Sequence, residues 1–597
     1  MPLSTGGIMK KTTLAIALAV ALGACSKNED SPEVGKQQAQ PAAPAKADIP
    51  LAFAPSTTAF VAGTMEPAPQ AYLDTIGAMA PQFKAGVLQS LERARQALAQ
   101  EEQNEQTARV NAVMDLLKER LQQPDTLASL GMSMKSLGAI YEIGGAPVLR
   151  MELQDADKFR AFIADVETRL GQKMETGELN GQAYWFMPLG AQAAQPAQAA
   201  DAQAASAQPL ERARLVAAIV GKHLVLALDP QHSAAPLAQL LGLERPAQSV
   251  LQAGTLTELQ KAYGYKPYGG NMLVDTRRVL ALLTEGQSIY PPPANWSEAC
   301  RSEFGALAAK APRLVVGATE VDGKKVGVAG TLELDKPLAG ELQKISAPVP
   351  GLGSAKKGVE FGFGVKIDQL AGFLQAQANA VQTAPYQCEH LQQLNEGMAS
   401  LNQSMAGLYA ASGWLTGARL VLNDINIEQQ LVRGMLVVAS PNPMSLLGMA
   451  QGMMPELAQL GLEPNGAAKQ LQSPMTAMVN GGQDPVWLAM TDKTLGLGIG
   501  ADVKGDLEGA LKASALSPEP LLYYRVDGET YAKSLGKFNE QMLNSLEANS
   551  SGAQQANDIM APMMQSIAQI YQSIDYASVR YHFSERGLEL DQIITFK

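Results

Sequence analysis

The chain has 597 residues, of which 46% are hydrophobic, and this is enough apolar sequence for several packed cores. The formal net charge is −11 and no basic stripe carries interleaved aromatic residues, which argues against nucleic-acid binding and against electrostatic attachment to anionic lipids. No segment after the N-terminal region has eighteen uninterrupted apolar residues, so we expect no transmembrane helix there.

The N-terminus has the pattern of a secretory signal peptide. Lys10 and Lys11 form a basic region, and the apolar run that follows at residues 14–22 is too short to span a bilayer. Residues 1–8 fit neither part of this pattern, so either Met1 or Met9 is the start of the protein.

The apolar run ends in Leu22-Gly23-Ala24-Cys25, which resembles the lipobox of bacterial lipoproteins. The resemblance implies removal of residues 1–24 and lipidation of the Cys25 thiol, which would anchor the protein to a membrane. The alternative is an ordinary secretory signal with a chance cysteine. Ser26 replaces the aspartate that commonly retains such Gram-negative proteins at the inner membrane, so the resemblance favours the outer membrane, facing the periplasm.

Residues 25–49 are rich in Ala, Gln, Pro, Lys and Glu and contain few large apolar side chains. Such a segment cannot bury enough surface to fold. We therefore expect a flexible tether with a reach of about 25 to 30 Å.

The body of the chain contains a set of elements that recurs in one order. In the first copy we expect a strand at 59–63, helices over 71–122, a hairpin at 137–153, a helix at 157–170, a hairpin at 215–229, a strand-to-helix unit at 272–275 and a hairpin at 314–334. In the second copy the matching segments are 361–365, 368–412, 420–438, 443–460, 486–502, 524–527 and 579–596. The pattern predicts two α+β repeats, 50–340 and 350–597, each an antiparallel sheet with helices on one side and a helical hairpin.

Local signals support these boundaries. We expect hairpin turns at Gly221-Lys222, Asp322-Gly323, Asp492-Lys493 and Arg586-Gly587. Asp275 and Asp527 each end a strand where a helix begins, so their carboxylates can accept hydrogen bonds from the first helical amides. Residues 191–208 form a low-complexity insertion, and residues 348–357 form a connector rich in Pro, Gly and Ser.

Cys300 and Cys388 are the two cysteines that remain once Cys25 is acylated. Because the periplasm is oxidising, we expect them to form a disulfide that joins the two repeats and stabilises the fold by about 4 to 5 kcal/mol. Two free thiols, or a metal site with His390, are the alternatives. A metal site is disfavoured because no second cluster of ligands would complete it.

The sequence contains no motif that demands a particular chemistry. His223 adjoins a predicted turn and His582 lies on the polar face of a predicted strand, so we interpret both as exposed. The pairs Ser354/Lys357 and Ser534/Lys537 match a catalytic Ser-x-x-Lys spacing without its companion motifs. We therefore expect a protein that is not an enzyme and has no cofactor or metal.

Two features concern packing or ligands. Glycine alternates with apolar residues at 495–500 and at 361–365, which leaves a bare strand face for a closely packed helix or for a ligand, and we favour the helix. Methionines cluster on two predicted helices, where core filling is the simpler interpretation and a ligand site is the other. The candidate ligand residues are Met449, Met453, Met560 and Met564.

These observations support two functional hypotheses. The first is a non-catalytic envelope lipoprotein that binds a protein partner or acts as a scaffold. The second is a carrier that holds a lipid or another apolar ligand between sheet and helices, an idea that rests on architecture alone.

Overall fold

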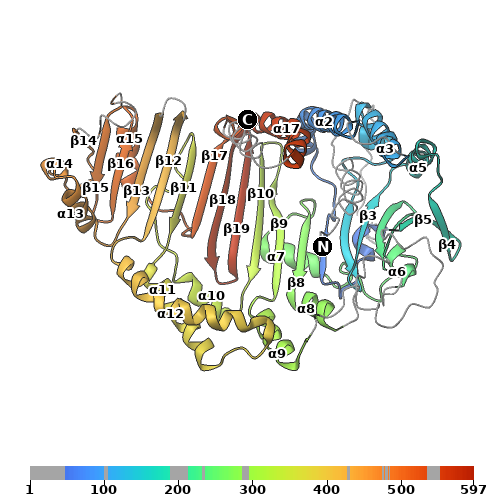
Figure 1. Ribbon diagram of the computed structural model, residues 1–597, viewed down its shortest axis with the longest axis horizontal. Coiled ribbons are helices and arrows are strands. Elements are labelled where there is room, and N and C mark those ends of the chain that lie inside the picture. Colours follow the sequence, from blue (N-terminus) through green and yellow to red (C-terminus); the bar gives the residue numbers. More distant parts are fainter. Residues whose placement is uncertain are drawn as a thin grey trace, which may run out of the picture. The chain divides into compact units, whose positions relative to one another are not determined.

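The computed structural model describes residues 48–99, 105–188, 213–230, 236–285, 293, 295–426, 431–473, 476, 482, 484–533 and 551–597. The expected signal peptide, Cys25, most of the tether, the 191–208 insertion, and the Ser534/Lys537 pair lie outside these ranges. The protein is mixed α+β with extensive antiparallel sheet (Figure 1). No helix in the described ranges combines the length and the apolar character needed to cross a membrane.

The chain divides into two compact units that interleave in sequence. Unit 1 comprises Met1–Asn295, Val315–Val326 and Ala532–Ser573, and unit 2 comprises Trp296–Leu314, Gly327–Tyr531 and Ile574–Lys597. Each unit thus includes segments from both of the expected sequence ranges.

Unit 1 is built on a sheet in which neighbouring strands are antiparallel, in the order β8–β1–β2–β3–β7–β6–β5–β4. Its strands are β1 (Phe60–Gly63), β2 (Gly138–Ile143), β3 (Ala146–Glu152), β4 (Glu175–Leu179), β5 (Gln182–Pro188), β6 (Arg214–Val220), β7 (His223–Asp229), β8 (Asn271–Asp275) and most of β9 (Arg313–Val321). The β4–β5 hairpin was not expected from the sequence.

The helices of unit 1 are η2 (Pro50–Phe53), α2 (Gln70–Ala99), α3 (Glu105–Gln122), α4 (Thr126–Ser129), α5 (Ala156–Leu170), α6 (Leu237–Leu241), α7 (Thr255–Tyr263), α8 (Thr276–Thr284) and α17 (Ser551–Gln572). Although α2 and α17 are far apart in sequence, they pack along each other (Figure 1). Gly86 permits this approach, since a Cβ there would lie 2.5 Å from the Ser566 hydroxyl of α17.

The strands of unit 2 are likewise antiparallel to their neighbours, in the order β19–β18–β17–β11–β12–β13–β16–β15–β14. These strands are β11 (Val359–Gly364), β12 (Gly417–Asn426), β13 (Leu431–Ala439), β14 (Lys469–Leu471), β15 (Val486–Met490), β16 (Thr494–Ile499), β17 (Leu522–Asp527), β18 (Ile574–Ser584) and β19 (Gly587–Phe596); most of β10 (Lys325–Glu333) also belongs to this unit.

The helices of unit 2 are α9 (Glu298–Lys310), α10 (Lys336–Gln343), α11 (Ile367–Thr383), η5 (Glu389–Leu391), α12 (Gln392–Ser412), α13 (Pro443–Met453), α14 (Glu456–Gln459) and α15 (Val503–Lys512). The pair α11 and α12 forms the expected helical hairpin (Figure 1). Of the expected turns, three fall as placed; the last falls at Glu585-Arg586, one residue earlier, and Gly587 begins β19.

Helices contact both faces of each sheet, which corrects the expectation that they lie on one side. In unit 2, α15 packs on Val421, Val437 and Ala489, while the α13–α14 region packs on Leu488 and Leu497 of the opposite face. In unit 1, α5 packs on Ile219 and Leu224, and α6 packs on Val216 and Ala218 of the opposite face. Each sheet therefore has cores on both sides, and neither face is fully wet.

The expected disulfide is present, with Sγ atoms of Cys300 and Cys388 2.01 Å apart. It links α9 to the segment before η5, and both cysteines are buried beside Leu391. The bond links the expected sequence ranges 50–340 and 350–597, but both cysteines belong to unit 2, so it closes a loop within one compact unit.

Candidate functional site: an apolar sheet face

The strongest candidate for a binding surface is one face of the unit 2 sheet. In antiparallel strands, residues directly opposite each other point to the same face. Across β17, β11, β12, β13 and β16 the register defines three rows on one face, here called the apolar face. The rows are Tyr524–Phe361–Leu420–Leu436–Leu497, Leu522–Phe363–Ala418–Val438–Leu495 and Val526–Val359–Leu422–Gly434–Ile499.

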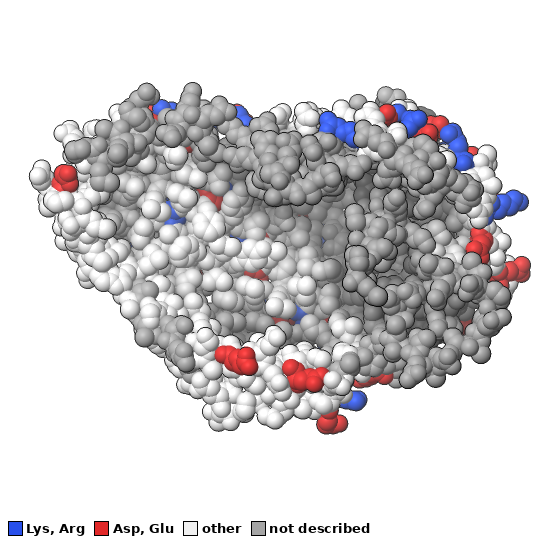
Figure 2. Space-filling view, viewed as in Figure 1, with Lys and Arg blue, Asp and Glu red and all other residues white. Residues whose placement is uncertain are grey.

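Every position in these rows is apolar, apart from the hydroxyl of Tyr524. Several of the side chains are nevertheless open to solvent: Phe361 is 41% exposed, and Leu420 and Leu436 are each 36% exposed. Figure 2 likewise presents few charged residues over these strands on the side that it shows. A contiguous exposed apolar patch of this kind is unusual for a surface with no binding role.

The other face of the same strands, here called the covered face, packs apolar residues against α15 and also holds a buried ion pair. It carries Glu360 and Arg419, which are both buried and paired at 2.5 Å between Nε and Oε1. Glu360 also accepts backbone hydrogen bonds from Gly353 and Ala355 of the connector. One ion pair of this part of the sheet is thus buried with apolar residues on the covered face, while Phe361, Leu420 and Leu436 on the other face are exposed.

Glycines allow α15 and the connector to pack closely on the covered face. A Cβ at Gly496 would lie 2.7 Å from Leu507 of α15, and one at Gly362 would lie 2.5 Å from Leu352 of the connector. The expected close packing of a helix is therefore confirmed at β16, whereas at β11 the connector takes the place of the expected helix. The connector is not a loose linker, because Leu352 is buried with Tyr523.

The pKa of Tyr523 on the covered face is raised. Burial raises the pKa of Tyr523 to about 12, and the charge of Glu360 acts in the same direction. Arg525 opposes the shift through its positive charge.

Unit 1 presents a related face. Its register defines the row Met272–Ala62–Ile140–Leu149–Leu226–Ala217–Trp185, in which every residue is apolar. Ile140 is as exposed as Phe361, and α5 covers the end of the row at Leu226 and Trp185. In unit 2 the end of the first row at Leu497 is covered by the α13–α14 region. Each face is therefore closed at one end and open in its middle.

The candidate methionines are not gathered into one site. Met449 and Met453 belong to unit 2 and are exposed on α13, on the side away from Leu447, which packs inward. Met564 is half-buried on α17 of unit 1, and the side chain of Met560 lies outside the described part of the structure. The exposure of Met449 and Met453 shows that core filling does not explain them.

The two histidines interpreted as exposed are both buried, which corrects that interpretation. His223 is 1% exposed and His582 is 3% exposed. His223 lies on the same sheet face as Arg150, and the Arg150 guanidinium is 3.3 Å from its Nδ1. Burial is the main cause that lowers the pKa of His223 to about 4, and the positive charge of Arg150 adds to the effect. His582 lies on the covered face of unit 2, where burial lowers its pKa.

Arg150 is buried, and its contacts give it a structural role. Its Nη2 donates to the carbonyl of Leu241 at 2.5 Å, and its guanidinium lies 3.6 Å from the centre of the Phe53 ring. A Cβ at Gly242 would overlap it, at 2.2 Å from Nη2. The guanidinium thus caps the end of α6 in a space that is already filled.

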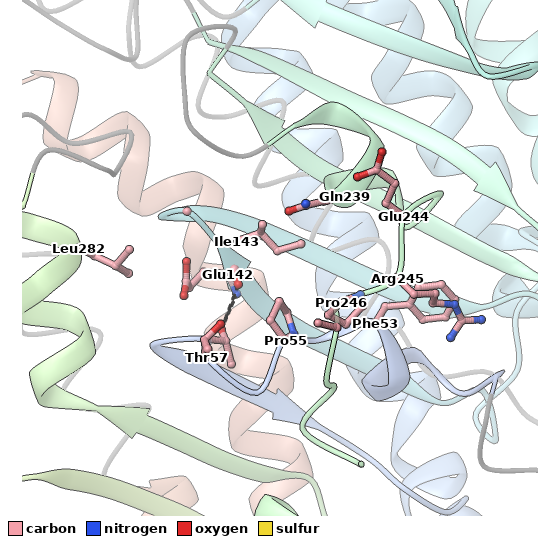
Figure 3. Close-up of a pocket in the computed structure, with 13 residues that line it drawn as sticks. Phe53, Pro55, Thr57, Glu142, Ile143, Gln239, Glu244, Arg245, Pro246 and Leu282 are labelled. Atoms are coloured by element: carbon pink, nitrogen blue, oxygen red, sulfur yellow. Dashed lines mark hydrogen bonds between the residues drawn. The ribbon is translucent and has the colours of Figure 1, made fainter. Parts of the chain in front are cut away.

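Unit 1 also contains a pocket of about 370 Å³ (Figure 3). Glu142, its buried acid, accepts hydrogen bonds from the amides of Ala59 and Gly145, both at 2.7 Å. Arg245 at the other end stacks on Phe53 and pairs with Asp48 at 3.2 Å. Glu142 and Arg245 therefore already have protein partners in this pocket.

Of the Ser-x-x-Lys candidates, Ser354 has a structural role. The Ser354 hydroxyl donates to the carbonyl of Gly351 at 2.6 Å and accepts from Arg419 at 3.0 Å. Within the described residues, no group of three or more His, Cys, Asp or Glu side chains could hold a metal ion.

Both capping aspartates behave as expected: Asp275 accepts from the amide of Arg278 at 3.1 Å, and Asp527 accepts from that of Thr530 at 2.8 Å.

Comparisons of the chain with protein-family profiles, with curated proteins and with solved structures find no match. The class of the site therefore rests on its geometry, which is that of an extended apolar binding surface on an antiparallel sheet.

Proposed function

We propose that this chain is a non-catalytic lipoprotein of the Gram-negative envelope, anchored through Cys25, which binds an apolar ligand along its sheet faces. The observation that carries the proposal is the apolar face of unit 2, in which three rows of apolar side chains include exposed Phe361, Leu420 and Leu436. Protein folding alone gives no reason to leave a contiguous row of Phe and Leu side chains exposed.

The apolar face favours the carrier hypothesis over a protein scaffold. Interfaces between separately folded proteins combine an apolar centre with polar groups and contain many hydrogen bonds. The three rows offer one hydroxyl, that of Tyr524, as a hydrogen-bonding side chain. A scaffold remains the second candidate, supported by the exposed methionines of α13.

We also propose that the two sheets arose from one duplicated unit. The order β8–β1–β2–β3–β7–β6–β5 in unit 1 corresponds strand by strand, in chain order, to β17–β11–β12–β13–β16–β15–β14 in unit 2. The partly covered apolar rows fall on corresponding strands. Duplication would give the protein two related binding faces.

The proposed function is tested by purifying the full chain with Cys25→Ser from the periplasm without detergent, followed by native mass spectrometry and solvent extraction. We expect bound lipid to be retained. A preparation that carries no lipid, together with crosslinked cells that yield no reproducible protein partner, would contradict the binding role.

The anchor is tested separately by metabolic labelling with palmitate. The unaltered chain should incorporate label and sediment with outer membranes, and Cys25→Ser should do neither. Labelling of the Cys25→Ser chain would place the lipid elsewhere.

A further inference from the structure

We propose that the occupant of the apolar face of unit 2 is an alkyl chain of a membrane lipid, lying across the strands along the row that contains Phe361, Leu420 and Leu436. This inference rests on the proposed function and specifies its ligand class. It is argued from strand pairing, the chemistry of the row, its length and its two different ends.

Strand pairing excludes one common way of binding a peptide. Each of β11, β12, β13 and β16 is hydrogen-bonded to a neighbour on both sides. An incoming segment therefore cannot extend the sheet at these strands and can contact only side chains.

The chemistry of the rows favours a ligand without polar groups. An extended peptide placed on them would bury backbone N–H and C=O groups against Phe, Leu and Val, with the Tyr524 hydroxyl as the one partner. An alkyl chain has no such groups to desolvate, and each buried methylene contributes about 0.8 kcal/mol. A helix forms its backbone hydrogen bonds internally, so a helical protein segment is the competing occupant that the test must distinguish.

The length of the row fits a lipid chain. The row continues beyond Tyr524 to Val579 of β18, and from Val579 to Leu497 it crosses six strands. Five strand spacings of about 4.8 Å give about 24 Å. One leaflet of a bilayer is about 15 Å thick in its hydrocarbon part, so a full acyl chain can lie on the row.

The two ends of the row differ in polarity. Beyond Val579 the next residue on the face is Gln592 of β19, and Tyr524 carries its hydroxyl near the same end. At the other end Leu497 packs with the α13–α14 region, beside Leu457 and Leu488. We therefore expect the polar head of the lipid toward β19 and the methyl end toward β16.

The test uses the full chain with Cys25→Ser and a photoreactive palmitic acid, whose crosslinks are mapped by peptide mass spectrometry. We expect crosslinks in β11, β12 and β13 of unit 2. Competition with unlabelled lauric acid, palmitic acid and a palmitoyl phospholipid then separates free fatty acids from membrane lipids as the source. Affinity should rise by up to about fourfold for each methylene added between the two acids.

The decisive comparison is between two leucines of unit 2 with similar exposure. Leu420→Asp places a carboxylate in the middle of the row and should lower crosslinking in β11–β13 at least tenfold. Leu394→Asp alters a leucine of α12 that is 42% exposed and lies outside the rows, and should leave crosslinking unchanged. Crosslinks in unit 1 serve as an internal standard, and circular dichroism melting checks that both variants fold.

Equal crosslinking of the two variants would place the probe elsewhere and overturn the inference. Loss of a protein crosslink in Leu420→Asp, with no alkyl binding in any variant, would identify a polypeptide occupant; the inference would then fail while a binding role survives. The absence of both kinds of binding would overturn the inference and the proposed function together.

Discussion

At the residue scale, the buried pair Glu360–Arg419 is the group on which the covered face of unit 2 most depends. Glu360→Ala would leave the buried guanidinium of Arg419 without its counter-charge, which typically costs about 3 to 5 kcal/mol. We expect the urea midpoint of unit 2 to fall accordingly. Glu341→Ala breaks an exposed pair with Lys344, is expected to cost about 1 kcal/mol or less, and serves as the control.

His223 should make unit 1 sensitive to acid. Its pKa in the folded protein is about 4, below the ordinary 6.5, so between these two pH values the unfolded chain takes up a proton that the folded chain does not. Stability should therefore fall as the pH drops through this window, by about 3 kcal/mol in all, and level off below it.

This prediction is checked by hydrogen exchange of the β7 amides at pH 7 and pH 4.5. In His223→Gln the difference between the two conditions should shrink, whereas replacement of the more exposed His390 by Gln should leave it unchanged. The same difference in His223→Gln as in the unaltered protein would assign the acid response to other groups.

At the element scale, the contact between β16 and α15 depends on glycine. Gly496→Val would drive side-chain atoms into Leu507 and Leu511, and overpacking of this kind costs about 1 to 3 kcal/mol. Gly505→Val lies on α15 itself, where a Cβ meets no atom within 4 Å, and should change stability by less than about 0.5 kcal/mol. Thermal melting of the two variants provides the measurement, and equal melting temperatures would contradict the packing argument.

At the scale of the whole molecule, we expect the disulfide to stabilise unit 2, which contains both cysteines. Cys300 and Cys388 are 88 residues apart in sequence, and a loop of that length is worth about 4 to 5 kcal/mol on the chain-entropy account. The double variant Cys300→Ser/Cys388→Ser should therefore show faster hydrogen exchange in α9 and α12 of unit 2. Unit 1, measured at β6 and β7, is the control, and equal destabilisation of both units would mean that the bond stabilises more than unit 2.

The sequence was informative wherever the structure depends on neighbours along the chain. The alternation of apolar residues predicted the strands of β12, β13 and β16, and the Val-Asp pairs at 275 and 527 predicted two helix caps. Strand alternation also showed which residues share a face. It could not show which face is covered, and this is why His223 and His582 were interpreted as exposed.

From the sequence alone we predicted most helices and strands in their order, although not the β4–β5 hairpin, together with most turns and the pairing of Cys300 with Cys388. The tertiary structure decided that α9 belongs to unit 2 and that helices lie on both sides of each sheet. It also decided that Glu360 and Arg419 point inward while Phe361, Leu420 and Leu436 face solvent. The physical reason is that side-chain periodicity and turn preferences are local, whereas burial depends on which distant segments, here α15 and the connector, pack on a given face.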